Sequence, residues 1–442
     1  MTTADRKAVP AGDRRAAPAA PAAGASALRE AVERHREALV QRLGAGEDGL
    51  ALGRANAGFL ETLLQERFEA AARGSRLPGR GVALAAVGSF GRGAVALRSD
   101  ADLVLVVDPK AVGTKDATEF LEALLYPLWD ATLPVGHQVL SSADAVALAQ
   151  QDLATATALL DLRLVAGDPG VLADLVSKAN EGLFGSEDLG AFIDRLEAEA
   201  TARHDRFGGS VYLLEPDVKS GAGGLRDLDG ARWAARARYR VRDDDTRGLG
   251  AWGELVRLGV LVAREAQEIG ASEEFIWRIR NRLHARAARK ADRLGFEEQE
   301  ALALAMGYGH DRARAAERLM QDYYLHAREV TRARPSLIER LRPPRRRKAA
   351  PATDLGGGVH LFDGHVTLAG SAALAHDPAI AMRLLAACVR QGAPILPFAR
   401  DAVTHATGDA AWCERLRESP EAARLFVELV CTVPETRTRR GS

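Results

Sequence analysis

Two adjacent motifs decide the fold: Val87-Gly88-Ser89-Phe90-Gly91-Arg92-Gly93 and, after six intervening residues, Asp100-Ala101-Asp102-Leu103. Short apolar runs at 81–87 and 103–107 predict two buried strands, one before the glycines and one that carries the acids. Side chains alternate along a strand, so Asp100 and Asp102 should project to one side while Ala101 and Leu103 point into the core. The stretch therefore predicts a sheet with two carboxylates beside a glycine-rich turn.

This turn and these acids suit a nucleoside triphosphate with its metal ions. Gly88 allows backbone amides to approach phosphates closely, Ser89 adds a hydroxyl donor, and the following segment begins a helix. Two neighbouring carboxylates repel unless cations lie between them, and Mg²⁺, in two ions, is the predicted occupant. The expected reaction is in-line attack on the α-phosphate with pyrophosphate leaving. The alternative is an ordinary turn in which Asp100 caps a helix or forms a salt bridge.

Other groups near the motif are weaker candidates. Arg92 is expected to contact phosphates, although a solvated surface position would also fit its sequence. A catalytic acid is expected on a third strand at 134–140, but this stretch contains none. His137 is the residue best placed there for catalysis, and a structural role is its alternative. The flanking Asp130 and Asp144 are less favourable candidates.

The composition indicates a helix-rich chain with no net charge. Its 442 residues exceed one ordinary hydrophobic core, so two or three domains are expected. Basic and acidic residues number 60 each, which argues against nucleic acid or an anionic membrane as a partner. No run of about 18 apolar residues predicts a membrane span. Cys388, Cys413 and Cys431 lack zinc-site spacing and are expected to be core thiols in a reducing compartment, so the cytoplasm is the expected location.

The order of patterns predicts an α+β fold in which a small mixed sheet precedes a helical bundle. Helical spacing is nearly continuous over 148–334, and prolines from Pro335 onwards with a basic run ending at Lys348 indicate a linker. A hairpin is expected over 359–368. The predicted parts are a disordered tail (1–26), N-terminal helices (27–78), a catalytic α/β domain (79–168), a helical domain (169–335), a linker with the hairpin (336–371) and a C-terminal helical segment (372–442).

The motifs resemble the polymerase-β-like nucleotidyltransferases and, more specifically, the bacterial PII uridylyltransferase/uridylyl-removing enzymes. The first two motifs and Val135-Gly136-His137 are compatible with several nucleotidyltransferases. The more specific similarity lies in Lys219-Ser220-Gly221-Ala222-Gly223-Gly224-Leu225-Arg226-Asp227, Trp233, Asn281-Arg282-Leu283-His284, Asp292-Arg293-Leu294 and Met320-Gln321-Asp322-Tyr323-Tyr324. Together these motifs extend the resemblance over roughly residues 50–435.

The resemblance implies transfer of UMP from UTP to a tyrosine hydroxyl of the PII signalling protein, in nitrogen regulation. Lys219 and Arg226 would then close on phosphates or on the protein substrate, with Asp227 orienting them; a helix-connecting turn with a surface ion pair is the alternative. The family continues into a His-Asp phosphohydrolase domain and two ligand-sensing domains. The chain ends at Ser442, so uridylyl removal and glutamine sensing are expected to be absent from it. Its dipeptides His204-Asp205, His310-Asp311 and His376-Asp377 lack convincing outlying ligands.

Three other functions compete with this one. The first is a different nucleotidyltransferase, such as one that adenylylates glutamine synthetase or modifies a small molecule. The second is a catalytically inactive nucleotide-sensing or scaffold protein, which the missing third acid would favour. The third, nucleic-acid binding through residues 340–348, is disfavoured because this basic run lacks aromatic residues and is broken by proline.

Overall fold

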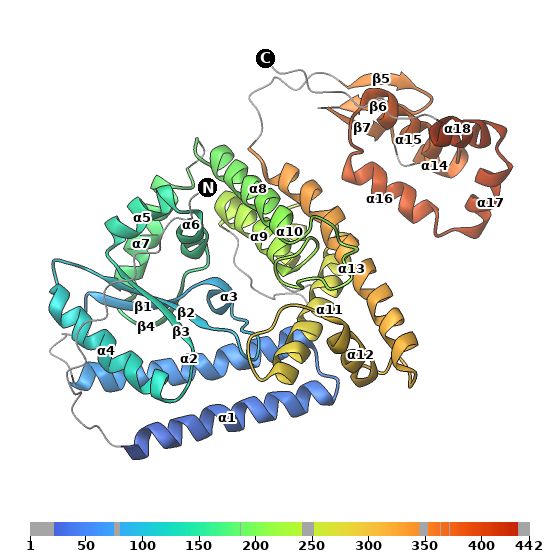
Figure 1. The fold of residues 1–442 in the computed structure, drawn as a ribbon. Coiled ribbons are helices and arrows are strands. Elements are labelled where there is room, and N and C mark those ends of the chain that lie inside the picture. The colour runs from blue at the N-terminus through green and yellow to red at the C-terminus, as the bar shows by residue number, and fades with distance from the viewer. Residues whose placement is uncertain are drawn as a thin grey trace. The chain divides into compact units, whose positions relative to one another are not determined.

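The computed structural model describes residues 22–74, 80–185, 187–240, 252–343, 352–362, 364–370 and 372–431. It divides into two compact units at Pro343/Pro344 (Figure 1). The first contains a mixed sheet and most of the helices, and the predicted α+β class is confirmed. In the described part of the chain, every helix is too short or too polar to span a bilayer.

A four-stranded mixed sheet of order β3-β2-β1-β4 carries the two motifs. Its strands are β1 (Val82–Ala86), β2 (Ala101–Val107), β3 (Val135–Leu140) and β4 (Arg163–Gly167). β1 is antiparallel to β2 and β4, whereas β2 is parallel to β3. β1 is buried throughout, and β2 is buried except at Asp102, as expected for apolar central strands covered on both faces. The exposed residue is therefore one of the two predicted acids.

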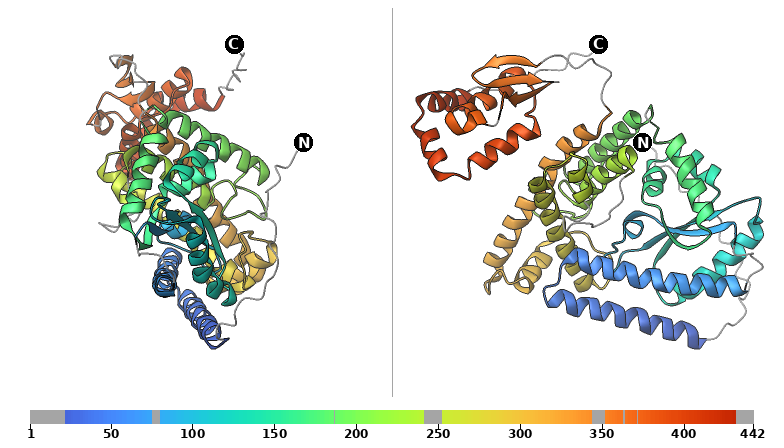
Figure 2. Two further views of the ribbon diagram at one scale, coloured as in Figure 1. Left: turned by 90° about the vertical axis from the view of Figure 1, so that its left-hand side faces the viewer. Right: turned by 180° about the vertical axis from the view of Figure 1, so that it is seen from behind.

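Helices cover both faces of this sheet (Figure 2). One face packs against α1 (Ala22–Gly44), α2 (Gly49–Gly74) and α4 (Thr114–Asp130) through alternate residues such as Leu84, Leu103 and Leu105. The other face presents Val104 and Val106 towards α5 (Ser142–Gln151), α6 (Leu153–Leu160) and α7 (Pro169–Gly182). Side-chain alternation thus assigns each position of β2 to one of two cores.

The strand β4 contradicts the expectation of continuous helix after residue 148. Leu159, Leu162 and Val165 recur every three residues, so the segment mimics a helical pattern. In the structure, β4 pairs with β1 instead. Arg163 then reaches α3 (Gly88–Gly91), where it donates hydrogen bonds to the carbonyls of Phe90 (3.1 Å) and Gly91 (3.3 Å). The unpredicted strand therefore supports the glycine-rich turn.

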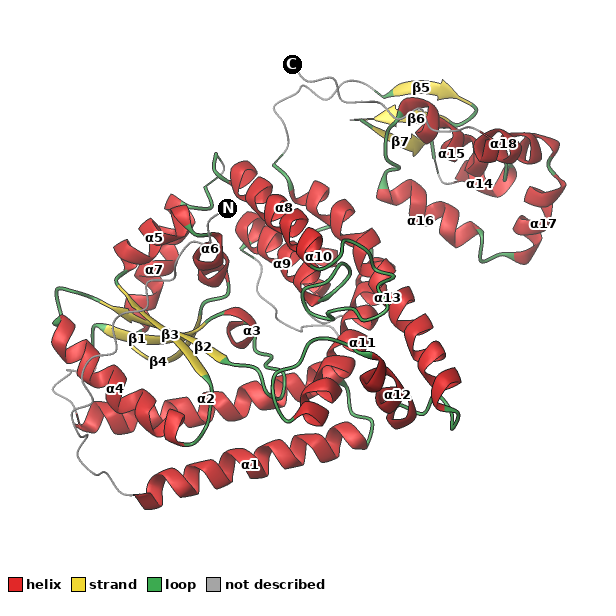
Figure 3. Cartoon of the chain, in the orientation of Figure 1, coloured by secondary structure: helices red, strands yellow, loops and turns green. Residues whose placement is uncertain are grey.

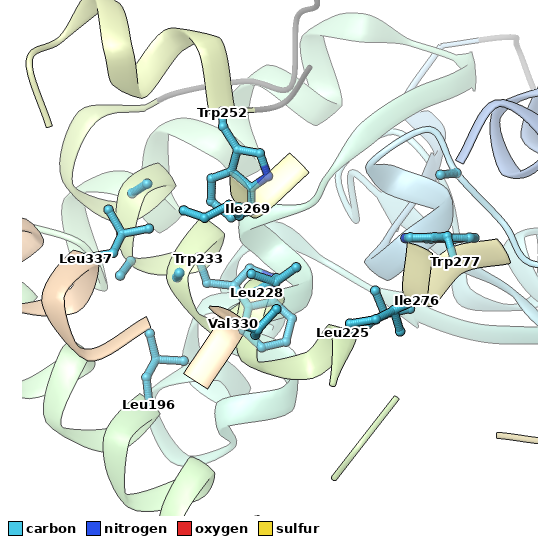
Figure 4. Packing of buried hydrophobic residues seen from close by; sticks show 14 of the residues in the cluster. Leu196, Leu225, Leu228, Trp233, Trp252, Ile269, Ile276, Trp277, Val330 and Leu337 are labelled. Atoms are coloured by element: carbon cyan, nitrogen blue, oxygen red, sulfur yellow. The ribbon is translucent and has the colours of Figure 1, made fainter. Parts of the chain in front are cut away.

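The remaining helices of the first unit form a bundle that shares a core with the sheet. They are α8 (Leu189–Arg206), α9 (Leu225–Tyr239), α10 (Gly253–Arg257), α11 (Ala263–Ala287), α12 (Phe296–Ala305) and α13 (Arg312–Leu341). Leu228, Ile276 and Leu337 pack at the centre of this bundle (Figure 4). The same apolar cluster extends to Val104 of the sheet. The bundle and one sheet face therefore bury their apolar surfaces against a common core.

The predicted start of the linker at Pro335 is wrong, because α13 continues through this proline to Leu341. A proline inside a helix costs about 3 kcal/mol. Leu337, Ile338 and Leu341 are buried beyond it, and each such side chain stabilises by about 1.5–3 kcal/mol. Arg340, assigned to the linker, pairs with Glu265 at 2.7 Å. Burial thus outweighs the cost of the proline; residues 344–351 lie outside the described residues.

The described residues of the second unit form a three-stranded antiparallel sheet and five helices. Its elements are β5 (Thr353–Gly356), β6 (Val359–Phe362), β7 (His365–Leu368), α14 (Ala372–His376), α15 (Ile380–Gln391), α16 (Pro397–Ala406), α17 (Ala410–Glu418) and α18 (Pro420–Cys431). The predicted hairpin is confirmed, with Phe362 paired to His365. β5 was not predicted; it adds to β6. Trp412 anchors the core and donates to the Leu374 carbonyl at 2.7 Å.

Several smaller expectations need correction. The tail was predicted to extend to Ser26, but α1 begins at Ala22; residues 1–21 lie outside the described residues. Cys431 is exposed, so the prediction of three core thiols is wrong for it, whereas burial raises the pKa of Cys388 to about 11.

The three His-Asp dipeptides have local structural contacts. Asp311 caps α13 by accepting from the Arg314 amide at 3.1 Å. Asp377 accepts from Arg383 at 2.7 Å. His204 Nε2 lies within hydrogen-bond distance of Asp227 Oδ1, at 2.9 Å. Each dipeptide thus places at least one of its side chains in an intrachain contact.

The loop between α8 and α9 passes close to the backbone of α13. Substitutions of its glycines therefore test the packing of the bundle. Gly223 has a φ of +75°, and a Cβ there would lie 2.3 Å from the Ala327 carbonyl oxygen. Gly209 has a φ of +67° but open space around it. Gly209→Ala should lose about 1–2 kcal/mol of unfolding free energy from backbone strain alone. Gly223→Ala should lose about 1–3 kcal/mol more because the backbone of α13 must move. Urea denaturation followed by circular dichroism measures both, and equal losses would contradict this packing.

Candidate functional site

A cavity of about 760 Å³ in the first unit brings together most of the predicted site residues. The α/β part contributes Gly88 and Ser89 at the start of α3, with Asp100 and Asp102 at the start of β2. The helical part contributes Lys219, Arg226, Arg232 and Arg280. The cavity is therefore built jointly by the sheet and by the bundle.

Asp102 lies against two glycines at one end of this cavity. It is on the same face of β2 as Val104 and pairs in register with Gly136 of β3. A Cβ at position 136 would lie only 2.6 Å from Asp102 Oδ1, and a Cβ at Gly88 would lie 3.5 Å from Oδ2. Gly88 itself has a φ of +59°, a region that glycine favours. The bare backbone on both sides leaves the carboxylate exposed to the cavity.

The surroundings of Asp102 disfavour the charged form of its carboxylate. Partial burial and the neighbouring charge of Asp100 raise the pKa of Asp102, while Lys219 and Lys290 oppose this shift. Lys290, from the loop between α11 and α12, donates to Asp100 Oδ2 at 3.0 Å. Cations thus already gather at this pair from two separate parts of the bundle. The same electrostatic demand would be met by a divalent metal ion.

The donor set fits magnesium in chemistry, although it holds only two carboxylates. Their hard oxygen atoms are the ligands that Mg²⁺ prefers, and this metal usually takes only one or two carboxylates, with water and phosphate oxygens completing its shell. Within the described ranges, no group of three or more His, Cys, Asp or Glu side chains is arranged to hold a metal ion. On the Asp102 face of β3, the register places Gly136 and Gln138. The third acid missing from the sequence is therefore not supplied by β3.

Lys219 and Arg226 are the cations best placed for a phosphate chain. Burial and the nearby Arg280 and Arg226 lower the pKa of Lys219 to about 8. Within the part of the chain that the structure describes, its ammonium makes no hydrogen bond or ion pair. Arg226 lies over the Trp233 ring, 5.1 Å from its centroid, and is only 3.5 Å from Asp229. A polyanion would relieve this concentration of positive charge.

Arg92, predicted to bind phosphate, is engaged by buried acids instead. Its guanidinium donates to Asp161 and lies 2.8 Å from Asp229. Asp161 is completely buried and also accepts from Trp233 Nε1 (2.9 Å) and Arg236 (2.5 Å). This network joins the end of α6 to α9 and to the residue after α3. Arg92 lines the cavity, but its charge is already compensated.

His137 lines the cavity, but strand alternation turns its side chain towards the other face of the sheet from Asp102. It pairs in register with Leu103, whose side chain points into the core beneath α4. Its ring centroid lies 5.6 Å from that of Trp129, on α4. Strand alternation therefore directs Gln138, rather than His137, to the face that carries Asp102.

Asp227, predicted to belong to the nucleotide-binding group by orienting Lys219 and Arg226, lies within the bundle and does not line the cavity. Its buried carboxylate accepts from Arg203 (2.8 Å), from His204 (2.9 Å) and from the Gly223 amide (2.8 Å). Burial opposes ionisation, but His204 and Arg203 hold the pKa of Asp227 below its usual range. The residue thus fixes the shape of the loop that presents Lys219.

Side chains near the end of α11 hold the residues that precede Asp100. Asn281 Oδ1 accepts from the Leu97 amide at 3.2 Å, and Arg280 donates to the Ser99 hydroxyl at 3.0 Å. His284 Nδ1 lies 3.2 Å from the amide nitrogen of Arg98. Three consecutive residues of the segment are therefore held by one helix. We call Arg280, Asn281 and His284 the α11 clamp.

The clamp fixes the tautomer of His284. A backbone N–H can only donate, so Nδ1 must accept and the proton must be on Nε2. Nε2 lies 3.1 Å from Asp292 Oδ1, which also accepts from Arg280 at 2.7 Å. Burial lowers the pKa of His284, consistent with a neutral ring. Asp292 thereby orients two of the three clamp residues.

The sequence interpretation missed Arg280, Lys290, Asp161 and Gln138 as contributors to the site. Signals for two of them were present, because Arg280 directly precedes the Asn281-Arg282-Leu283-His284 motif and Lys290 lies two residues before Asp292-Arg293-Leu294. No local signal marks Asp161, whose partners are distant in sequence. Gln138 becomes recognisable only when the register of β3 is known.

Comparisons with known proteins agree with this arrangement. The family model described as GlnD PII-uridylyltransferase matches residues 191–338, and the one described as putative nucleotidyltransferase DUF294 matches residues 33–132. The chain is 33% identical to the bifunctional uridylyltransferase/uridylyl-removing enzyme of Bradyrhizobium diazoefficiens over 79% of its own length and 38% of that protein. The corresponding values are 33%, 87% and 41% for the enzyme of the same name from Gluconobacter oxydans.

The chain spans about two-fifths of the length of these curated relatives. Both matched families cover segments that line the cavity, since Asp100 and Asp102 fall in one and Arg226 and Arg280 in the other. The resemblance drawn from the motifs is therefore confirmed: over most of its length, the chain is similar to part of the bifunctional uridylyltransferase/uridylyl-removing enzymes.

Proposed function

We propose that this protein transfers UMP from UTP to a tyrosine hydroxyl of the PII signalling protein and releases pyrophosphate. The observation that carries the proposal is the exposed Asp100–Asp102 pair, which shares one cavity with Gly88 and Lys219. The similarity to bifunctional uridylyltransferase/uridylyl-removing enzymes supports the uridylyl group, and the similarity to the GlnD PII-uridylyltransferase family supports the PII acceptor. The reaction would take place where the cytoplasmic nucleotide pool supplies UTP.

Different residues of the cavity would act at the two ends of the triphosphate. Asp100 and Asp102 would hold Mg²⁺, in two ions, and the metal would supply Lewis-acid polarisation of the α-phosphate. Gly88 and Ser89 begin α3, so their N–H groups and the Ser89 hydroxyl would donate to phosphate oxygens. Lys219 and Arg226 would neutralise the departing pyrophosphate. His137 receives no step here because its ring packs against Trp129.

One observation favours a second candidate function, a nucleotide-binding regulatory protein without transferase activity. Neither Gly136 nor Gln138 provides a carboxylate next to Asp102. A transferase would then need water or the acceptor itself to manage the proton of the attacking hydroxyl. Transfer to another protein or to a small molecule, including adenylyl transfer, keeps the same site and differs in substrate.

Removing either carboxylate should abolish transfer without unfolding the chain. We expect Asp100→Asn and Asp102→Asn to lower the rate of labelled UMP incorporation into PII by roughly 100-fold or more, because the metal loses a charged ligand. EDTA should have the same effect on the wild type. Asp130→Asn, which changes an exposed acid at the end of α4, should leave the rate unchanged.

The wild type also separates the competing functions. Label from UTP but not from ATP should enter PII. Label from ATP alone would indicate an adenylyltransferase. A folded wild type that binds UTP but transfers neither nucleotide would contradict the proposal and support the regulatory alternative.

The α11 clamp gives a further prediction, because His284 holds the segment before Asp100 and does not line the cavity. In His284→Asn, the amide oxygen can replace Nδ1 as acceptor for the Arg98 N–H, whereas in His284→Gln the longer side chain can replace only the Nε2 donor to Asp292. Loosening this segment should lower kcat of His284→Gln roughly 10- to 100-fold. The KM for UTP should change by less than about twofold, since the lost contact acts on the catalytic geometry.

Steady-state kinetics, together with thermal unfolding of both variants, make this comparison. His284→Asn should retain most of the wild-type kcat and should need less Mg²⁺ for half-maximal activity than His284→Gln. Equal losses in two variants of equal stability would show that the Arg98 contact has no positioning role.

A further inference from the structure

A paired surface segment adjoins the catalytic cavity on its Asp100 side. Residues 212–218 belong to the loop between α8 and α9, and residues 290–296 lead from α11 into α12 (Figure 3). Residues 216–218 and 292–294 lie antiparallel, with a bridge between Asp217 and Arg293. The Val218 amide donates to the Asp292 carbonyl at 2.8 Å, and the Leu294 amide donates to the Pro216 carbonyl at 2.9 Å. We call these two segments, with Arg286 and Arg289 at the end of α11, the platform.

Both segments of the platform lead directly into the catalytic cavity. Residue 218 is followed by Lys219, which lines the catalytic cavity, and Lys290 binds Asp100. Asp292 anchors two residues of the α11 clamp. A second cavity of about 570 Å³ is lined by charged residues of both signs, the basic Arg286, Arg289, Lys290 and Arg293 and the acidic Glu215, Asp217, Asp292 and Glu298. Since Asp100 lines the first cavity and Lys290 the second, their ion pair lies between the two cavities.

The platform exposes large apolar side chains next to this second cavity. Tyr212 is 59% exposed, Leu214 67% and Phe296 57%. The backbone that carries them is held in place, because Gln299 donates to the Leu214 carbonyl at 2.6 Å and Glu215 accepts from the Phe296 amide at 3.1 Å. Exposed aromatic groups on a fixed backbone are typical of protein interfaces.

Two positive charges on the platform have no acidic partner in the described ranges. Arg293 pairs with Glu215 at 2.6 Å, and Lys290 pairs with Asp100. Arg286 and Arg289 are exposed and line the second cavity, but no ion pair involves either of them within the part of the chain that the structure describes. An acidic ligand would therefore gain charge complementarity without first breaking an internal salt bridge.

We propose that the platform binds the acceptor protein, through a segment in which acidic and apolar residues accompany the modified tyrosine. This inference rests on the proposed transferase function and deepens it by locating the acceptor. The catalytic cavity already offers Lys219 and Arg226 to the phosphates, so the platform cations remain for a different ligand. A hydroxyl delivered from the platform enters beside Asp100, where the attacking group is needed. Arg286 and Arg289 bind the acidic residues, and Tyr212 and Phe296 contact the apolar ones.

The test compares the double variant Arg286→Glu/Arg289→Glu with the wild type, using the full chain, PII and UTP. The KM for PII should rise at least about tenfold, as expected when two attractive charges become repulsive, and should become less sensitive to salt. The KM for UTP and kcat at saturating PII should stay within about twofold of wild type. Phe296→Ala provides an uncharged second variant, for which the KM for PII should rise by roughly three- to tenfold.

Arg34→Glu/Arg314→Glu is the matched control, because both arginines are exposed, line neither cavity and have no ion pair among the described residues. It should leave both KM values unchanged. A rise in the KM for UTP alone would assign the platform arginines to the nucleotide and overturn the proposal. Unchanged KM values in both platform variants, or an equal rise in the control, would also overturn it.

A binding measurement separates this proposal from the proposed function. Calorimetric titration of PII into the chain with a nonhydrolysable UTP analogue reports docking without turnover. Weaker binding by Arg286→Glu/Arg289→Glu would support the platform even if the wild type transferred no UMP, a result that would contradict only the transferase function. If the wild type transferred UMP and the platform variants bound PII as tightly as the wild type, the result would contradict the platform proposal and leave the transferase function intact.

Discussion

Two carboxylates held side by side at the start of β2 impose the main constraint on this structure. Asp100 and Asp102 repel each other, and partial burial increases the cost of charging Asp102. The chain answers with cations from outside the sheet, namely Lys290 at Asp100 and Lys219 near Asp102. The helical bundle is therefore an electrostatic partner of the sheet as well as a packing partner. A metal ion and a phosphate chain would complete the same balance.

Apolar packing, hydrogen bonds and buried ion pairs also join the sheet to the helical bundle. A common apolar core extends from Val104 in the sheet to the centre of the bundle. The α11 clamp holds residues 97–99, and the buried carboxylate of Asp161 connects Arg92 to α9. Buried pairs of this kind contribute little net stability but fix geometry, since removing one partner leaves an uncompensated charge. The cavity thus depends on contacts that neither the sheet nor the bundle makes alone.

The sequence was informative where a local pattern decides the structure. Strand alternation placed Asp102 on the open face of β2, and the glycines of the first motif marked the turn at α3. It was misleading where distant packing decides, as in β4, whose leucine spacing imitates a helix, and at Pro335, where buried leucines outweigh the proline. Arg92 and Asp227 looked like ligand contacts because a charged residue beside glycines has the same local pattern whether its partner is a phosphate or a buried ion. Only their three-dimensional partners distinguish these cases.

The Asp161 network also constrains how this protein can change over generations. One acid satisfies Arg92, Trp233 and Arg236, which belong to different segments of the chain. A neutral residue at 161 would remove one carboxylate partner from each of two buried guanidinium groups, and the loss of either arginine would leave the carboxylate undercompensated. Substitutions at these positions are therefore tolerated only when they occur together. Across homologous sequences, such a junction should appear as correlated substitution between sites about seventy residues apart.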